Sequence, residues 1–245
     1  EGFDKLDGKL IKEAMDGNIV FFGGAGVSTA SGIPDFRGNG GLYTEPDEDA
    51  DERPEEILTA DYLYRKSARF FAYYRTHMVY PDAKPNDAHI ALAKLERQGK
   101  LSAVVTQNID GLHQEAGSKK VIELHGSTKR NYCVRCGKEY TLAHVMESGD
   151  VPHCGQCGGM VRPDVTMYGE SLPMEAFYEA EKVIAAADVL IVGGTSLTVY
   201  PAAALIREYR GDHLIIINQS PTPYDQYAEY VIRDSIEKVL RELTE

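Results

Sequence analysis

The chain has 245 residues, four cysteines and a formal net charge of −12 at pH 7. This acidic balance argues against broad contact with nucleic-acid phosphates or with an anionic membrane surface. No run of 18 apolar residues exists to cross a bilayer, and residues 1–10 lack the basic start and apolar core of a signal peptide, so we expect a cytoplasmic protein.

The acidic residues are unevenly distributed along the chain. Eight acids and one arginine between Glu45 and Glu56 give this segment a net charge of −7. Most such runs are solvated loops, and the alternative is a surface that attracts lysine-rich peptides. The sequence leaves both interpretations open.

Short apolar runs alternate with helical patterns along the chain. In chain order, the patterns predict a strand at Ile19–Phe22, a helix at 56–79, a helix from Asn86 to Gly99, strands at Ser102–Thr106 and Val121–Leu124, a helix at Pro173–Ala187, a strand at Asp188–Val192, a helix at Pro201–Tyr209, a strand at His213–Ile217 and a helix at Ser235–Leu240. This alternation predicts an α/β fold with a doubly wound parallel sheet. The segments 38–80 and 130–160 interrupt it, so we expect them to form a smaller domain.

The first predicted strand ends in the glycine-rich stretch Gly23–Gly26. Glycines let backbone N–H groups approach a ligand closely, and Ser28 and Thr29 can start a helix whose N-terminus favours phosphate. The stretch departs from the GxGxxG dinucleotide fingerprint because Thr29 stands where the third glycine belongs. By itself the pattern fits a nucleotide-phosphate cradle and an ordinary tight turn about equally well.

The four cysteines form two Cys-x2-Cys pairs separated by 17 residues, at Cys133, Cys136, Cys154 and Cys157. This spacing is typical of a zinc site. Four thiolate ligands leave no coordination position for an activated water, so we expect one structural Zn²⁺. Two disulfides are the competing interpretation, but nothing in the sequence indicates an oxidising compartment.

Residues 24–37 add a second signal to the glycine stretch. In GAGVSTASGIPDFR, a rigid Gly-Ile-Pro turn is followed at once by an acid, an aromatic ring and a guanidinium. This stretch closely resembles the signature of the sirtuins, which are NAD-dependent protein lysine deacylases. Segments similar to other sirtuin motifs follow in the expected order: QNIDGLH at 107–113, His125-Gly126, RPDVTMYGE at 162–170 and GTSLTVYP at 194–201.

The resemblance implies a fold and a set of cofactor contacts. The Rossmann-like NAD-binding domain would comprise residues 1–37, 81–129 and 161–245, and the helical insertion 38–80 and the zinc-ribbon module 130–160 would form the small domain. The implied NAD contacts are Gly24, Ala25, Gly26, Ser28, Thr29, Asp35, Phe36, Arg37, Gln107, Asn108, Ile109, Asp110, His125, Gly194, Thr195, Ser196, Asn218 and Ile232.

The resemblance also implies catalytic roles. His125 would be the general base, Asn108 would position a water or the ribose, and Asp110 with Ile109 would hold the nicotinamide amide. In the implied mechanism the acetyl oxygen attacks C1′ of the ribose as nicotinamide leaves. His125 then deprotonates a ribose hydroxyl, and water completes the release of lysine and O-acetyl-ADP-ribose.

The peptide would lie between two exposed backbone edges. The implied substrate contacts are Val165, Thr166, Tyr168, Gly169, Glu170, Leu197 and Val199, and Thr166 stands where the family usually has valine. Sirtuins that prefer succinyl or malonyl groups carry Tyr-x-x-Arg on the preceding helix. Here the frame reads Ala72 to Arg75, without the tyrosine, so acetyl and other neutral acyl groups are favoured.

The implied function is NAD-dependent protein lysine deacetylation by a monomer that acts on acetyl-lysine proteins or peptides and binds neither membrane nor nucleic acid. Mono-ADP-ribosyl transfer and removal of longer neutral acyl groups are alternatives on the same fold. A zinc-ribbon nucleic-acid binder is disfavoured by the net charge. A hydride-transfer dehydrogenase is disfavoured because it needs the third glycine and an acid at the end of the second strand.

Overall fold

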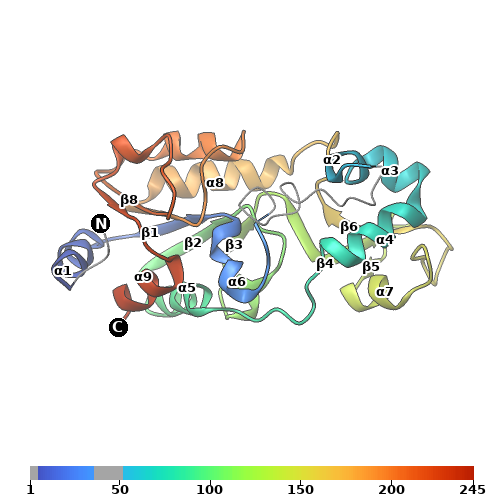
Figure 1. The fold of residues 1–245 in the computed structure, drawn as a ribbon, viewed down its shortest axis with the longest axis horizontal. Helices are drawn as coiled ribbons and strands as arrows, with labels where there is room; N and C mark the ends of the chain where they lie inside the picture. Colours follow the sequence, from blue (N-terminus) through green and yellow to red (C-terminus); the bar gives the residue numbers. More distant parts are fainter. Residues whose placement is uncertain (1–4, 36–51) are drawn as a thin grey trace.

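A six-stranded parallel sheet forms the larger part of the structure, a computed structural model that describes residues 5–35 and 52–245 (Figure 1). Its strands are β1 (Ile19–Gly23), β2 (Leu101–Thr106), β3 (Val121–Glu123), β7 (Val189–Gly193), β8 (His213–Ile217) and β9 (Tyr230–Ile232). They lie in the order β3-β2-β1-β7-β8-β9. The strand order reverses between β1 and β7, and such a reversal is where ligands bind in folds of this class.

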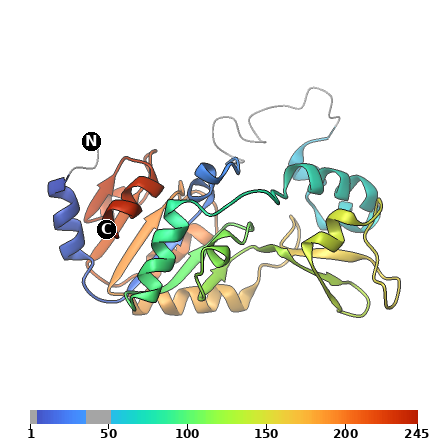
Figure 2. The ribbon, with the colours of Figure 1, turned by 90° about the horizontal axis from the view of Figure 1, so that it is seen from below.

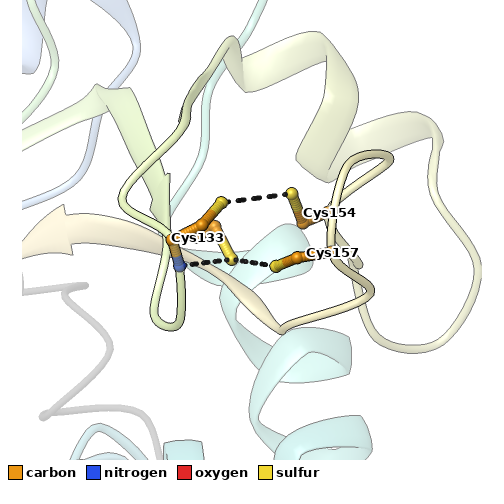
Figure 3. Close-up of side chains that lie close together, drawn as sticks. Cys133, Cys154 and Cys157 are labelled. Carbon is orange, nitrogen blue, oxygen red and sulfur yellow. Dashed lines mark hydrogen bonds between the residues drawn. The ribbon is translucent and has the colours of Figure 1, made fainter.

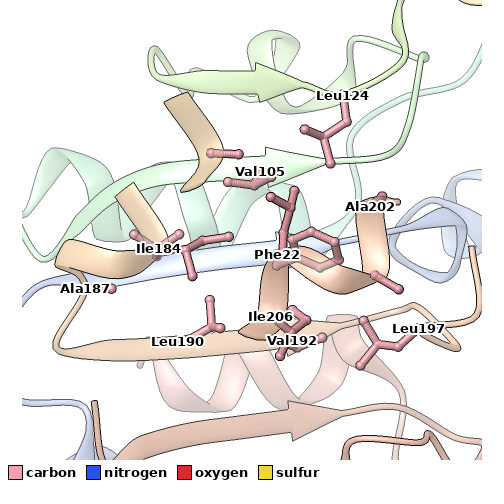
Figure 4. Packing of buried hydrophobic residues seen from close by; sticks show 14 of the residues in the cluster. Phe22, Val105, Leu124, Ile184, Ala187, Leu190, Val192, Leu197, Ala202 and Ile206 are labelled. Carbon is pink, nitrogen blue, oxygen red and sulfur yellow. The ribbon is translucent and has the colours of Figure 1, made fainter. Parts of the chain in front are cut away.

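Helices cover both faces of this sheet because its strands bury side chains on both sides. Phe22 and Val192 pack against α8 (Met174–Ala186) and the 3-10 helix η3 (Ala202–Glu208), as Figure 4 shows. Phe21 and Ile191, their neighbours in sequence, face α1 (Lys5–Ala14), α5 (Asp87–Arg97) and α9 (Ile236–Leu243). Each such buried side chain stabilises the fold by about 1.5–3 kcal/mol relative to exposure.

A smaller module lies beyond one end of the parallel sheet (Figures 1 and 2). It contains the antiparallel strands β4 (Gly126–Cys133), β5 (Glu139–Tyr140) and β6 (Val161–Val165), together with α2 (Pro54–Ile57), α3 (Ala60–Arg65), α4 (Ser67–His77) and α7 (Leu142–Glu147). Phe70 and Tyr74 of α4 stack with ring centroids 5.6 Å apart in its core. Cys133 and Cys154 belong to the same apolar cluster, so the cysteine pairs are built into this module.

The predicted fold class is confirmed: the structure is α/β, with a doubly wound parallel sheet and a smaller module that carries the four cysteines. The predicted domain boundaries stay a prediction, and β6 pairs with β4 in the small sheet although its residues were assigned to the larger domain. Short elements complete the connections: α6 (Leu112–Glu115), η1 (Ala25–Val27), η2 (Thr29–Ser31) and η4 (Asp225–Tyr227). Among the described residues, no helix has the length and apolar character to cross a bilayer.

The prediction of one continuous helix over 56–79 is wrong. The segment forms parts of three helices, because Leu58, Thr59 and Lys66 leave the helical conformation. Thr59 has extended backbone and its Oγ1 accepts a hydrogen bond from the Tyr62 N–H at 3.1 Å, which starts α3. Lys66, with φ −125° and ψ 53°, separates α3 from α4.

Two further helices were predicted with the wrong geometry. The chain after β1 does not begin a regular helix at Ser28 and Thr29 but makes the two 3-10 turns η1 and η2, which end at Gly32 with φ +87°. The predicted helix at Pro201–Tyr209 is also a 3-10 helix, η3. A nucleotide phosphate at the first turn would therefore meet glycine backbone rather than the end of a long helix dipole.

Candidate active site and metal centre

The ends of β1 and β7 pair directly, at the point where the strand order reverses. The Gly26 N–H donates a hydrogen bond to the Gly194 carbonyl at 2.8 Å. A Cβ on Gly26 would lie 2.7 Å from the Gly194 Cα, and a Cβ on Gly194, whose φ is +62°, would lie 2.5 Å from the Val27 nitrogen. The two turns therefore pack backbone against backbone, which requires glycine at both positions.

A cleft of about 360 Å³ is lined by these turns and by the ends of the neighbouring strands. Nine of the predicted NAD contacts line it: Ala25, Gly26, Thr29, Asp35, Gln107, Gly194, Thr195, Ser196 and Asn218. Gly24 lies close by, since a Cβ there would approach the Thr195 Cβ to 3.0 Å. The residues are thus brought together as the family resemblance implies, and their contact with NAD stays a prediction.

Seven further lining residues were missed by sequence analysis: Ile217, Gln219, Ser220, Asp234, Ser235, Ile236 and Glu237. They lie between the last residue of β8 and the first turn of α9, and the polar stretch after Asn218 was the available signal. Ile232, predicted to contact adenine, is not among the residues that line this cleft, and its contact with NAD stays a prediction. Its side chain is 5% exposed and packs in the core beside α9.

A buried hydrogen-bond network is centred on the Ser28 hydroxyl. Asn108 Nδ2 donates to Ser28 Oγ at 3.3 Å, and Ser28 Oγ donates to Asp110 Oδ2 at 2.6 Å. The Asn86 N–H donates to His89 Nδ1 at 3.1 Å, so the neutral His89 ring carries its proton on Nε2, which donates to Ser28 Oγ at 3.3 Å. With two bonds accepted and one donated, the hydroxyl is saturated and holds the Asp110 carboxylate in one orientation.

His89 and His113 pack ring against ring, with centroids 4.8 Å apart, and both are buried. Neither ring nitrogen of His113 has a hydrogen-bond partner in the part of the chain that is described. Burial lowers the pKa of His113 to about 3, and the neighbouring His89 acts in the same direction. Burial also lowers the pKa of His89. His89 was missed by sequence analysis, although the spacing from Asn86 is that of a helix cap and the third helical residue.

His125 lies between the cleft and the predicted peptide segment. Its Nδ1 is 3.0 Å from the Gln107 carbonyl oxygen, which can only accept, so Nδ1 carries the proton of the neutral ring. Nε2 is then the nitrogen that can take up a proton. The Gln107 side chain donates to Thr195 Oγ1 at 3.4 Å in the cleft, and the His125 carbonyl accepts from the Thr166 N–H at 3.0 Å.

The predicted substrate residues divide into exposed and buried side chains. Tyr168 and Gly169 are exposed, and Thr166, Glu170 and Val199 are half-buried. Tyr168 is held by its backbone, since its N–H donates to the Leu58 carbonyl at 3.0 Å and its own carbonyl accepts from the Ala60 N–H at 3.2 Å.

The other two substrate residues have buried side chains. Val165 packs in the core of the small module, and Leu197, with φ +56°, packs in the core beside α8. A direct peptide contact from either side chain would need a rearrangement, whereas their backbone groups stay candidates for peptide contact.

The four cysteine sulfurs lie within 4.8 Å of one another (Figure 3). Cys133 Sγ is 3.4 Å from Cys157 Sγ, and Cys136 Sγ is 3.6 Å from Cys154 Sγ. A disulfide needs about 2.05 Å, so the sulfurs are not bonded to one another. Tetrahedral zinc with Zn–S bonds of about 2.3 Å separates its sulfurs by roughly 3.8 Å, so this cluster has the size and the donor set to hold a zinc ion.

Tyr140 supports one of these sulfurs directly. Its hydroxyl donates to Cys154 Sγ at 3.0 Å and accepts from the Gly155 N–H at 2.8 Å. The hydrogen bond from Tyr140 is the largest of the effects that lower the pKa of the Cys154 thiol to about 6. Since metals bind the thiolate, this lowered pKa favours metal binding at Cys154.

Two predicted NAD contacts, Phe36 and Arg37, lie outside the described residues, as does the part of the acidic segment from Glu45 to Asp51. Their predicted roles stay predictions.

Comparison with known proteins agrees with this geometry. A profile of the Sir2 family matches residues 24–201. An NAD-dependent protein deacetylase of Clostridium perfringens is 55% identical over 240 residues, covering 96% of this chain and 98% of the relative. A solved structure of Sir2 with a p53 peptide and NAD⁺ superposes with a TM-score of 0.80 at 40% identity, covering 96% of this chain and 95% of that one. A Sir2 variant with deacetylated p53 peptide and 3′-O-acetyl-ADP-ribose gives 0.83 at 40% identity, covering 96% of each chain. The chain belongs to the Sir2 family.

Proposed function

We propose that this protein is an NAD-dependent protein lysine deacetylase that converts acetyl-lysine and NAD to lysine, nicotinamide and O-acetyl-ADP-ribose. One observation carries the proposal: the His125 Nδ1 lies 3.0 Å from the carbonyl oxygen of Gln107, which lines the glycine-walled cleft, while the His125 carbonyl binds Thr166 of the predicted peptide segment. The relatives named as deacetylases, and the Sir2 complexes with peptide, NAD⁺ and an acetylated ADP-ribose, support the same function.

The cleft fits a dinucleotide in its chemistry. The close approach of Gly26 and Gly194 leaves backbone rather than side chains along the wall, as a pyrophosphate requires. Asn218 and Ser196 offer hydrogen-bonding groups to ribose hydroxyls. NAD, when bound, would supply the ADP-ribose that accepts the acyl group.

The polar network around Ser28 would orient the end of the cleft that receives nicotinamide. Because the Ser28 hydroxyl is saturated, Asp110 cannot turn toward solvent without breaking a 2.6 Å hydrogen bond. A fixed carboxylate and a fixed Asn108 amide reduce the reorganisation that the site needs during reaction.

His125 would act as the general base through Nε2. The Gln107 carbonyl stabilises the protonated ring by accepting from Nδ1, so a proton taken at Nε2 leaves an imidazolium that is already hydrogen-bonded. The Nδ1–H bond also fixes the ring plane, and with it the direction in which Nε2 points.

The acyl preference follows from Arg75. An anionic acyl group would need a free cation near its carboxylate, but the Arg75 Nε donates to the Val145 carbonyl at 2.9 Å and its Nη2 to the Gly149 carbonyl at 2.7 Å. Arg75 therefore fastens α7 to α4. This supports acetyl and other neutral acyl groups as substrates. The net charge of −12 supports the expectation that the protein has no nucleic-acid partner, and the monomer stays a prediction.

The test follows turnover of an acetyl-lysine peptide with and without NAD, and measures nicotinamide and acetylated ADP-ribose together. His125→Ala should abolish both products, and His213→Ala, which alters a half-buried histidine at the start of β8, should leave them unchanged. Deacetylation without NAD, or with His125→Ala at the wild-type rate, would exclude the proposal. Gain of ADP-ribose by the peptide would indicate ADP-ribosyl transfer instead.

A further inference from the structure

We propose that Arg162 and Glu170 form an internal clamp that fixes the backbone of residues 166–170 for the acyl-lysine peptide, and that Glu170 is a positioning residue rather than a peptide contact. The inference rests on the proposed deacetylase function. It revises the direct contact with the peptide that the family resemblance implies for Glu170.

The Arg162 guanidinium is buried and uses all of its donors. Nε donates to the Pro163 carbonyl at 3.1 Å, and Nη2 donates to the Val165 carbonyl at 3.0 Å and to Glu170 Oε1 at 2.8 Å. Nη1 donates to Glu170 Oε2 at 2.7 Å and to the Tyr64 hydroxyl at 3.2 Å. A guanidinium has five N–H donors, so this one is saturated within the protein.

The Glu170 carboxylate is equally occupied. Both of its oxygens accept from Arg162 in a bidentate pair, and Oε1 also accepts from the Met167 N–H at 3.0 Å. The hydrogen bonds from Arg162 lower the pKa of Glu170 below its ordinary value, so the carboxylate is ionised at neutral pH. A carboxylate committed to three internal donors is poorly placed to bind a peptide side chain.

The hydrogen bond from the Met167 N–H to Glu170 Oε1 closes a turn that contains Gly169, whose φ is +86°. The segment is therefore fixed at three points: the Thr166 backbone by the His125 carbonyl, the Tyr168 backbone by Leu58 and Ala60, and Glu170 through its side chain by Arg162. The exposed Tyr168 and Gly169 between these points are what a peptide would meet.

Aromatic rings hold the clamp in place. The Arg162 guanidinium carbon lies 5.9 Å from the ring centroid of Tyr64 in α3 and 5.7 Å from that of Tyr132 in β4. Only 4% of the Arg162 side chain is exposed. A buried bidentate pair between aromatic rings depends on the fork geometry of arginine, which lysine cannot reproduce.

The test measures KM for an acetyl-lysine peptide and, separately, for NAD in the full-length protein. Glu170→Gln and Arg162→Lys should each raise the peptide KM roughly tenfold or more, and leave the KM for NAD unchanged. Matched controls are Asp87→Asn and Arg241→Lys, which alter an ion pair whose side chains are half exposed, and these should leave both KM values unchanged.

A second arm separates positioning from direct contact. If Glu170 positions the backbone, Glu170→Gln will raise KM equally for peptides with basic and with neutral residues beside the acetyl-lysine. A loss confined to basic peptides would overturn the inference in favour of direct contact. Wild-type peptide KM in both variants, or an equal rise of both KM values, would also overturn it. Absence of turnover in the wild-type protein would instead overturn the proposed function.

Discussion

Replacing Tyr140 by phenylalanine tests whether zinc binding by the four cysteines also depends on a hydrogen bond to one of their sulfurs. The change removes one hydroxyl that donates to Cys154 Sγ at 3.0 Å and accepts from the Gly155 N–H. Backbone N–H groups also donate to these sulfurs, but at longer distances of 3.4–3.5 Å, from Arg135 among others. We therefore expect Tyr140 to be the strongest single support of the site.

The magnitude follows from the hydrogen bond that is lost. A hydrogen bond to a charged group contributes about 1.5–3 kcal/mol, and the Gly155 N–H also loses its partner in the variant. Each 1.4 kcal/mol is a factor of ten, so the zinc Kd of Tyr140→Phe should rise roughly 10–100-fold.

The assay is competition for zinc with a chromophoric chelator under anaerobic conditions, on wild type and variant. Tyr74→Phe is the matched control: this tyrosine lies in the same apolar cluster, and its buried hydroxyl has no hydrogen-bond partner among residues 5–35 and 52–245. A cobalt-substituted sample gives a second readout, since the sulfur-to-cobalt charge-transfer band should shift in Tyr140→Phe and not in Tyr74→Phe. Equal Kd values in all three proteins would refute the reasoning.

Two further predictions concern the other site. Gly194→Ala should lower the free energy of unfolding by about 1–3 kcal/mol, because alanine is strained at the positive φ of this residue. It should also weaken NAD binding, because the new Cβ would lie 2.5 Å from the Val27 nitrogen. Urea unfolding measures the first effect and calorimetric titration with NAD the second, and an unchanged NAD affinity would contradict the prediction. The pKa of His113 is about 3 in the folded protein and about 6.5 in the unfolded chain, so below pH 6.5 the unfolded chain binds a proton that the folded protein does not. The free energy of unfolding therefore falls as pH drops from 6.5 toward 3, and is unaffected by this residue above pH 6.5. His113→Phe should remove this loss, about 1.4 kcal/mol per pH unit, in urea unfolding between pH 6 and pH 5. Parallel pH profiles of wild type and variant would show that His113 is not the group responsible.

The parallel sheet could be predicted from the sequence because its strands are buried on both faces and therefore read as continuous apolar runs. Ile19–Phe22 and His213–Ile217 are of this kind, and both are strands in the structure. Residues 126–133 gave no such signal, because β4 mixes buried and exposed polar side chains such as Asn131 and Lys129.

The helical errors have a local physical origin. The aromatic residues of 56–79 are consistent with one long helix, and only tertiary contacts reveal the breaks. Thr59 leaves the helix because its backbone bridges to Tyr168, more than a hundred residues away in the chain. No local pattern records that pairing.

Sequence analysis identified the site residues that belong to a local motif and missed those whose role depends on contacts between distant parts of the chain. The glycine turns and the cysteine pairs are of the first kind. His89 is of the second, since its role depends on contact with Ser28, 61 residues earlier. Glu170 lies in a family motif, but only the structure shows that its carboxylate is paired with Arg162 inside the protein.

The paired strands β4 and β6 connect the cysteine loops to the rest of the molecule, and this affects how the length of those loops can vary among related proteins. The chain enters the cysteine module along β4 and leaves it along β6, and these strands pair with each other from Gly126 opposite Val165 to Cys133 opposite Val161. The helices α2, α3 and α4 join the module from a separate part of the chain, so only the segment between β4 and β6 is held by this strand pair alone. Its outer loops can lengthen or shorten without moving the two strands. Grafting a relative's segment between β4 and β6 should therefore exchange the outer surface of the cysteine loops while leaving His125 in place, which makes this strand pair a natural junction for chimeric proteins.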